Sequence, residues 1–186
     1  MNLSLNNKGF TLVETLVAIA IFATSVTGLI SITARGINDN VYVKNKLLAS
    51  YLSQEGVELV RNMRDNSILS QVSWAQFLAS PDWVGNCYDT FNNDVNACYI
   101  DGSVSQVTAE SCVNGVCATP LSLDPVSSRY TYYSIYPSPF TRTITIRPIS
   151  SGNNEEVLVN SIVEWKQGTR THQVSYQYNL LNWFNP

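Results

Sequence analysis

The chain has 186 residues, of which 45% are hydrophobic and 13% charged, and its formal net charge is −3. This length suits one domain rather than two. With a pI near 5.0, the chain lacks the basic footprint of a nucleic-acid-binding protein. Composition therefore favours a single anchored or secreted domain, and it gives no indication of a nucleic-acid partner.

The first long apolar stretch carries one charge. Residues 10–34 contain no Lys, Arg or Asp, and Glu14 is their only charged side chain. As a helix, this stretch would be about 37 Å long, which is enough to cross a hydrocarbon core of about 30 Å. An acidic side chain at the centre of a bilayer costs about 2.5–3.5 kcal/mol. Glu14 is therefore a candidate functional residue.

The residues around Glu14 also follow a known pattern. The sequence Gly-Phe-Thr-Leu-Val-Glu at positions 9–14 resembles the cleavage and methylation motif of type IV prepilins and of the pseudopilins of type II secretion. This resemblance implies a leader at residues 1–9 that prepilin peptidase removes after Gly9. It further implies N-methylation of Phe10 and a role for Glu14 in assembly with other pilin or pseudopilin subunits.

Two other interpretations of the N-terminus compete with this one. An ordinary secretory signal peptide would place its small-residue cleavage site near Ala34 and leave Glu14 inside the apolar core. An unprocessed signal anchor explains the hydrophobicity but not the glutamate. A prepilin leader explains both features, so it is the preferred interpretation.

The helix is predicted to continue well beyond the apolar stretch. No proline occurs between Phe10 and Ser80, and apolar residues recur at helical spacing as far as Met63. We predict one helix from about Phe10 to Asp65, in which residues 10–34 form the membrane or filament-core half and residues 35–66 an amphipathic half. The residues predicted to form the apolar face of the amphipathic half are Ile37, Val41, Leu48, Tyr51, Leu52, Leu59 and Met63.

The middle of the chain is predicted to be a short helix followed by a long loop. Residues 70–79 are expected to form the helix, which ends before Pro81, and residues 82–125 are expected to be irregular. All four cysteines of the chain lie in this loop: Cys87, Cys98, Cys112 and Cys117. Their even number predicts two disulfides, and short local loops favour the pairs 87–98 and 112–117. Zinc is disfavoured, because the spacing lacks matched C-x2-C pairs.

The last third is predicted to form antiparallel strands. Residues 129–136, 142–146, 157–165 and 173–180 alternate apolar with polar side chains, which is the pattern of half-buried strands. Turns are predicted at residues 137–139, 151–154 and 166–168. The expected fold class is α+β, with the long N-terminal helix packed on an antiparallel sheet at 129–180 inside an extracytoplasmic domain at 67–186. The pilin resemblance implies the same architecture.

We expect no catalytic site, cofactor or metal. His172 is the single histidine and lies in a predicted strand, where a structural role is expected. No phosphate-binding or nucleophile-elbow motif is present. Residues 92–96 place oxygen ligands as in a calcium loop, but the glycine and closing glutamate are missing, so a turn is preferred.

The sequence thus predicts a structural subunit, a minor pilin of a type IV pilus or related filament, rather than an enzyme. A sizeable domain, its cysteine loop, and Trp165 and Trp183 near the C-terminus favour a minor subunit. Two alternatives stay open: a type II secretion pseudopilin, and a membrane-anchored adhesin or ligand-binding module. The expected location is a single pass through the inner or cytoplasmic membrane, and then the filament or cell surface. The positive-inside rule alone does not select this orientation, which depends on the cysteines and the leader.

Overall fold

The computed structural model describes residues 9, 11–89, 96–102, 109–115, 117–150 and 153–183, of which residues 150, 153 and 154 are described by their backbone only. The chain divides into two compact units, Met1–Val43 and Lys44–Pro186. Helix α1, Leu12–Leu69, contributes to both units and contains 58 residues. The predicted long helix is confirmed, and it ends four residues later than Asp65.

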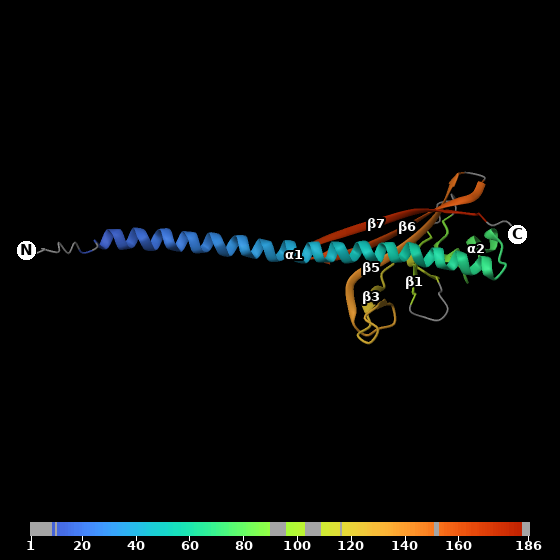
Figure 1. The fold of residues 1–186 in the computed structure, drawn as a ribbon, viewed down its shortest axis with the longest axis horizontal. Helices are drawn as coiled ribbons and strands as arrows, with labels where there is room; N and C mark the ends of the chain where they lie inside the picture. Colours follow the sequence, from blue (N-terminus) through green and yellow to red (C-terminus); the bar gives the residue numbers. More distant parts are fainter. Residues whose placement is uncertain are drawn as a thin grey trace, which may run out of the picture. The chain divides into compact units, whose positions relative to one another are not determined.

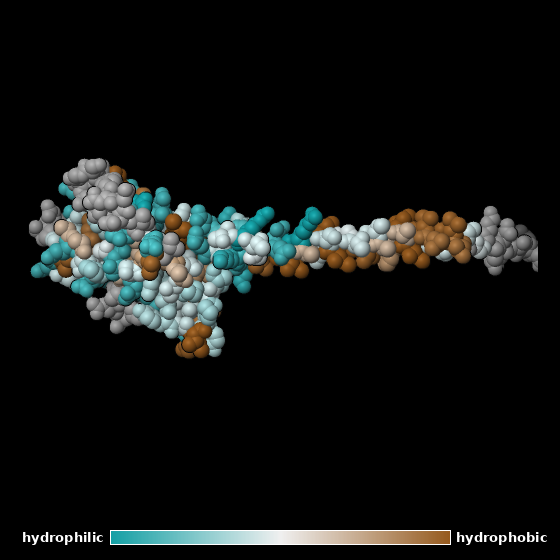
Figure 2. Space-filling model, turned by 180° about the vertical axis from the view of Figure 1, so that it is seen from behind, coloured by the Kyte–Doolittle hydropathy of each residue, from teal (hydrophilic) through white to brown (hydrophobic). Residues whose placement is uncertain are grey.

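Residues 12–43 of α1 are almost entirely exposed, and Figure 2 shows the hydrophobic colour concentrated along this part of the helix. Large apolar side chains such as Leu12, Ile19 and Phe22 are 65–75% exposed. Within the described residues, α1 is the one helix that is long and apolar enough to cross a membrane. This part of the chain therefore has no hydrophobic core of its own.

The second unit is built on a seven-stranded antiparallel sheet, drawn in Figure 1. Its strands are β1 (Cys98–Ile100), β2 (Ala109–Ser111), β3 (Pro120–Leu123), β4 (Tyr130–Thr131), β5 (Pro137–Ser150), β6 (Asn153–Gln167) and β7 (Arg170–Leu181). Strands β5, β6 and β7 form a meander, as predicted. The other edge of β5 pairs with β1 at Ile144 and with β3 near Pro137 and Thr141, so β5 is the central strand.

The C-terminal part of α1 packs on this sheet. Its buried residues are Ala49, Leu52, Ser53, Gly56, Val57, Val60, Met63, Arg64 and Ser67. The predicted apolar face was partly wrong, because Tyr51, Ile37 and Val41 are exposed while Ser53 and Gly56 are buried. Small residues let the helix approach the strands closely, which a hydrophobicity pattern does not capture.

Two local predictions in the middle of the chain are corrected. The second helix, α2, covers only Trp74–Ala79, because Ser73 caps its N-terminus by accepting a hydrogen bond from the Gln76 N–H. The segment 82–125 is not irregular throughout, since it contains β1, β2, β3 and two short 3-10 helices, Gly85–Cys87 and Val113–Gly115.

The predicted strand at 129–136 and the predicted turn at 137–139 were also wrong. Strand β4 ends at Thr131, because the Tyr132 N–H donates to the Asp101 carboxylate (2.8 Å) instead of to a neighbouring strand. Pro137 and Pro139 belong to β5. Proline is tolerated there because Pro137 begins the strand and pairing with β6 starts only at Phe140.

Candidate functional site

The N-terminal motif lies where α1 begins. Gly9 is exposed, and a Cβ placed on it would have no heavy atom within 4 Å. The chain itself therefore does not require glycine at this position. Phe10, the predicted site of N-methylation, and the leader residues 1–8 lie outside the described residues.

Glu14 is exposed in the first turn of α1. Its backbone N–H donates to the Thr11 hydroxyl (3.3 Å) and to the Thr11 carbonyl (3.1 Å), so Thr11 caps the helix. A Thr-x-x-Glu sequence is typical of a capping box, a signal that could have located the start of the helix more closely. The carboxylate also complements the positive end of the helix dipole. Among the described residues, none forms an ion pair with Glu14.

The hydroxyl groups of the apolar half are satisfied within the helix. Every Ser and Thr side chain from Thr15 to Thr33 donates to a backbone carbonyl three or four residues earlier, at 2.7–3.1 Å. Each of these hydroxyl protons therefore has a hydrogen-bond partner within the helix and does not need water. Glu14 is then the one side chain of this half whose polarity no described bond offsets.

Two disulfides fasten the segment between α2 and β3. Cys87 bonds to Cys98 and Cys112 to Cys117, the two pairs that the sequence favours. Cys87 and Cys98 are fully buried. Hydrogen bonds support the same region, because the Asn86 amide donates to the Ala109 carbonyl (2.7 Å) and the Cys112 N–H donates to the Ala97 carbonyl (2.8 Å).

Arg142 joins α1 to the sheet. The residue is 1% exposed, and its guanidinium donates to the Leu52 carbonyl (3.1 Å), the Glu55 carboxylate (3.0 Å) and the Ile100 carbonyl (2.7 Å). Strand alternation could have revealed this position, because Arg142 shares the face of the buried Ile144 and Ile146. Arg142 is therefore a structural residue of the core.

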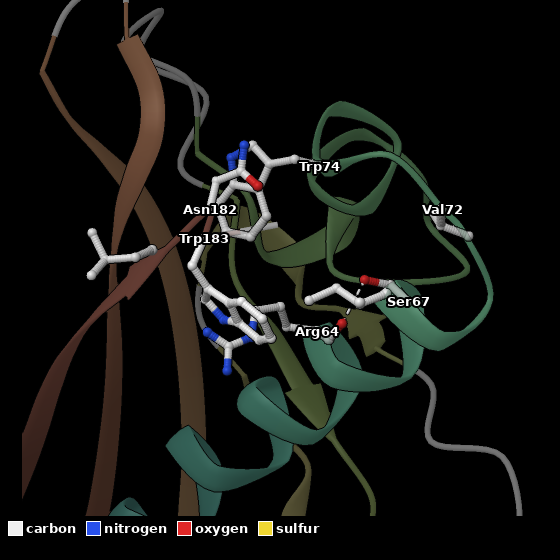
Figure 3. A pocket seen from close by; sticks show the side chains of 8 residues that line it. Arg64, Ser67, Val72, Trp74, Asn182 and Trp183 are labelled. Carbon is white, nitrogen blue, oxygen red and sulfur yellow. Dashed lines mark hydrogen bonds between the residues drawn. The ribbon is translucent and has the colours of Figure 1, made fainter. Parts of the chain in front are cut away.

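A small pocket lies where the C-terminal turns of α1 meet the end of β7 (Figure 3). The Trp183 ring lies over the Arg64 guanidinium at 5.6 Å, and the Ser67 hydroxyl donates to the Arg64 carbonyl. The volume of about 10 Å³ is the space that one water needs. This pocket is thus too small to hold a ligand.

Among the residues that the structure describes, no cluster of three His, Cys, Asp or Glu side chains that could hold a metal is found. His172 stacks on the Trp165 ring, with 5.3 Å between the ring centroids. The calcium-like segment at 92–96 lies mostly outside the described residues.

Comparison with known families agrees with the N-terminal motif. Residues 4–30 match the family model described as the prokaryotic N-terminal methylation motif. No curated protein and no solved structure matches the chain. Together with the long apolar helix and the sheet that α1 packs on, this match makes the chain a type IV pilin-like protein. It is a subunit of the pilin or pseudopilin type, from a family that is structural rather than enzymatic.

Proposed function

We propose that this chain is a minor pilin and not an enzyme, cut by prepilin peptidase after Gly9, methylated on the Phe10 amine and assembled through its N-terminal helix. The proposal rests on the environment of the Glu14 side chain. Glu14 carries the only charge in the apolar half at residues 10–34, whose described residues are almost all exposed, and the Ser and Thr hydroxyls from Thr15 to Thr33 are all hydrogen-bonded within the helix. A charge in that setting is costly in lipid unless a partner is supplied.

In the assembled filament, that partner is the Phe10 amine of a neighbouring subunit. After cleavage the amine is positively charged and lies four residues before Glu14, about one helical turn. Pairing the Glu14 carboxylate of one subunit with the amine of the next removes two unpaired charges from an apolar environment and selects one axial register. The same pairing favours the transfer of the subunit from the membrane into the filament.

Before assembly, residues 10–34 anchor the chain in the inner or cytoplasmic membrane, and the C-terminal domain lies on the extracytoplasmic side. The two disulfides support this orientation, because disulfides persist in oxidising compartments.

The test compares two glutamates on the same helix. Glu14→Ala should be cleaved after Gly9 like the wild type but should fall at least tenfold in sheared filaments, measured by blotting. Glu58→Ala is the matched control, because Glu58 is exposed and pairs with Arg61 on the surface. Equal incorporation of Glu14→Ala and Glu58→Ala would rule out the assembly role.

Gly9 separates processing from assembly. Since this chain leaves open space around Gly9, Gly9→Val should fold normally and fail only at the peptidase. N-terminal sequencing should then find the uncut chain. Cleavage of Gly9→Val at the same bond would contradict the proposed leader.

Fractionation of the wild-type chain distinguishes the alternatives. A minor pilin should co-purify with sheared pili. A pseudopilin should stay in the cell envelope, and its deletion should stop secretion of an exported protein. A membrane-anchored adhesin should stay with the membranes and leave both pili and secretion intact.

A further inference from the structure

An open cleft lies beside strands β3 and β4, remote in sequence from the N-terminal motif. It is formed by the turn between these strands and by the segment that follows β4. The residues that line it are Asp124, Ser127, Arg129, Thr131, Tyr133 and Ser134. Its volume of about 350 Å³ is at the small end of the range of about 300–1,000 Å³ for ligand pockets. The size suits a ligand of one or two small rings.

The two serine hydroxyls at this cleft already donate hydrogen bonds within the chain. Ser127 donates to the Asp124 carboxylate, and Ser134 donates to the Leu123 carbonyl (3.0 Å). A hydroxyl oxygen that donates its proton keeps two lone pairs, of which Ser134 uses one to accept the Tyr136 N–H (3.4 Å). Both serines can therefore still accept a hydrogen bond from a ligand, and they suit a ligand that carries O–H groups.

Arg129 is the one cation in the lining. It is exposed, and it forms no ion pair with any residue that the structure describes. The nearby carboxylate of Asp124 is occupied by its own turn, because it accepts hydrogen bonds from the Val126 N–H (3.1 Å) and the Ser127 N–H (3.2 Å). The five guanidinium N–H donors of Arg129 match a planar carboxylate, which they can hold by two parallel bonds.

Tyr133 adds a flat apolar surface to the cleft. Its side chain is 66% exposed, and two apolar neighbours of the lining residues, Val126 and Ile135, are 92% and 83% exposed. Figure 2 shows a separate hydrophobic patch at the lower end of this domain, where Figure 1 places β3. An aromatic ring with a polar tip suits a ligand that has one apolar face and a polar rim.

The cleft is also held in shape before any ligand binds. The Asp124 N–H donates to the Arg129 carbonyl (2.9 Å), the Ser128 N–H donates to the Asp124 carbonyl (2.8 Å), and the Leu123 N–H donates to the Tyr136 carbonyl (2.9 Å). A binding loop that is already ordered loses less conformational entropy on binding.

We propose that this cleft binds a sugar that carries a carboxylate, such as a uronic acid. Arg129 pairs with the carboxylate, Ser127 and Ser134 accept hydrogen bonds from the sugar hydroxyls, and the ring of Tyr133 packs against the C–H face of the sugar. The site is independent of Glu14 and of the N-terminal helix, so it holds whichever machine the subunit serves.

The test is a binding titration of the full chain in a detergent without sugar headgroups. The probes are glucuronate, galacturonate, mannuronate and N-acetylneuraminate, with glucose as the neutral counterpart of glucuronate and inorganic phosphate as a simple anion. At least one acidic sugar should bind saturably and at least tenfold more tightly than glucose and phosphate. The proposal is wrong if no acidic sugar binds, or if phosphate binds as tightly as the best of them.

Two pairs of variants locate the site. Arg129→Gln and Tyr133→Ala should each weaken binding of the acidic sugar at least tenfold. Arg170→Gln and Tyr176→Ala are the matched controls, because both residues are exposed, lie on β7 and do not line the cleft; they should leave the affinity within twofold. Retained binding in Arg129→Gln, or an equal loss in Arg170→Gln, would place the sugar elsewhere and overturn the assignment.

Discussion

Helix α1 contains two regions with opposite relations between hydrophobicity and burial. Residues 12–43 are the more apolar, yet nearly all of them are exposed. Residues 44–69 are more polar, yet nine of them are buried, including two serines, a glycine and an arginine. Hydrophobicity alone therefore does not identify the core of this chain. The first region is suited to lipid or to other subunits, whereas the second region packs closely on its own sheet.

In each region, a serine hydroxyl donates a hydrogen bond to a backbone carbonyl of α1 itself. Ser25 in the first half donates to the Ile21 carbonyl (2.7 Å), and Ser67 in the second half donates to the Arg64 carbonyl (2.7 Å). Ser25 is exposed, whereas Ser67 is buried in the fold. An internally bonded hydroxyl is thus compatible with lipid in one region and with close packing in the other.

The largest expected effect is a loss of stability in the core that the second region of α1 forms with the sheet. Arg142→Met keeps much of the side-chain volume but removes three hydrogen bonds between the sheet, α1 and β1. Breaking a buried ion pair costs about 3–5 kcal/mol. Because Glu55 is partly exposed, we expect the free energy of unfolding to fall by about 3 kcal/mol. Denaturant unfolding followed by tryptophan fluorescence measures it. Arg170→Met, at an exposed position, should change stability by less than about 0.5 kcal/mol. Equal effects of the two changes would contradict a structural role for Arg142.

The disulfides should contribute unequally to the second region. They close loops with sequence separations of 11 and 5 residues, for which loop entropy gives about 2.8 and about 2.1 kcal/mol. Replacing Cys87 and Cys98 by serine should therefore destabilise the domain more than replacing Cys112 and Cys117. The full burial of Cys87 and Cys98 adds to this difference. Thermal unfolding of the two double variants measures it, and the reverse order would show that burial and loop length do not govern stability here.

The same substitution made in both regions of α1, at Gly36 and at Gly56, tests the comparison directly. A Cβ on Gly56 would overlap the Ser161 hydroxyl and lie 3.0 Å from the Arg142 Cδ, whereas a Cβ on Gly36 meets no heavy atom within 4 Å. Gly56→Ala should therefore cost about 1–3 kcal/mol by overpacking. Gly36→Ala should not destabilise the chain, because alanine favours a helix by about 1 kcal/mol over glycine. Thermal unfolding measures both, and tolerance of Gly56→Ala would mean that the helix can move away from the sheet.

The smallest expected effect is on the stability of the chain at acidic pH. Hydrogen bonds from the Ser127 hydroxyl and then the Val126 N–H lower the pKa of Asp124 below its usual value. Since the pKa is lower in the folded chain, the carboxylate stabilises the fold above its unfolded pKa of about 3.9, and this contribution is lost as pH falls through the folded pKa. Asp124→Asn should flatten the acid limb of the melting temperature plotted against pH. Asp82→Asn should not, since among the described residues none donates a hydrogen bond to the Asp82 carboxylate.

Several elements followed from local sequence. The long helix needed only a proline-free run with helical periodicity, and β6 and β7 needed only strict alternation. The early end of β4 at Thr131 could not be predicted, because it depends on Asp101, which lies 31 residues before Tyr132 and accepts the Tyr132 N–H. The cleft at Arg129 could not be predicted either, since its lining residues are common turn residues with no motif.

By itself, the sequence determined the apolar helix, the position of Glu14 near its start and the even number of cysteines. These are properties of residue type and spacing along one chain, so no folded partner is needed to read them. Only the tertiary structure decided which face of α1 is buried, that Arg142 is a core residue and that Asp124, Arg129 and Tyr133 line one cleft. Such features depend on close approach between segments far apart in sequence, where fit and hydrogen-bond geometry outweigh local preference.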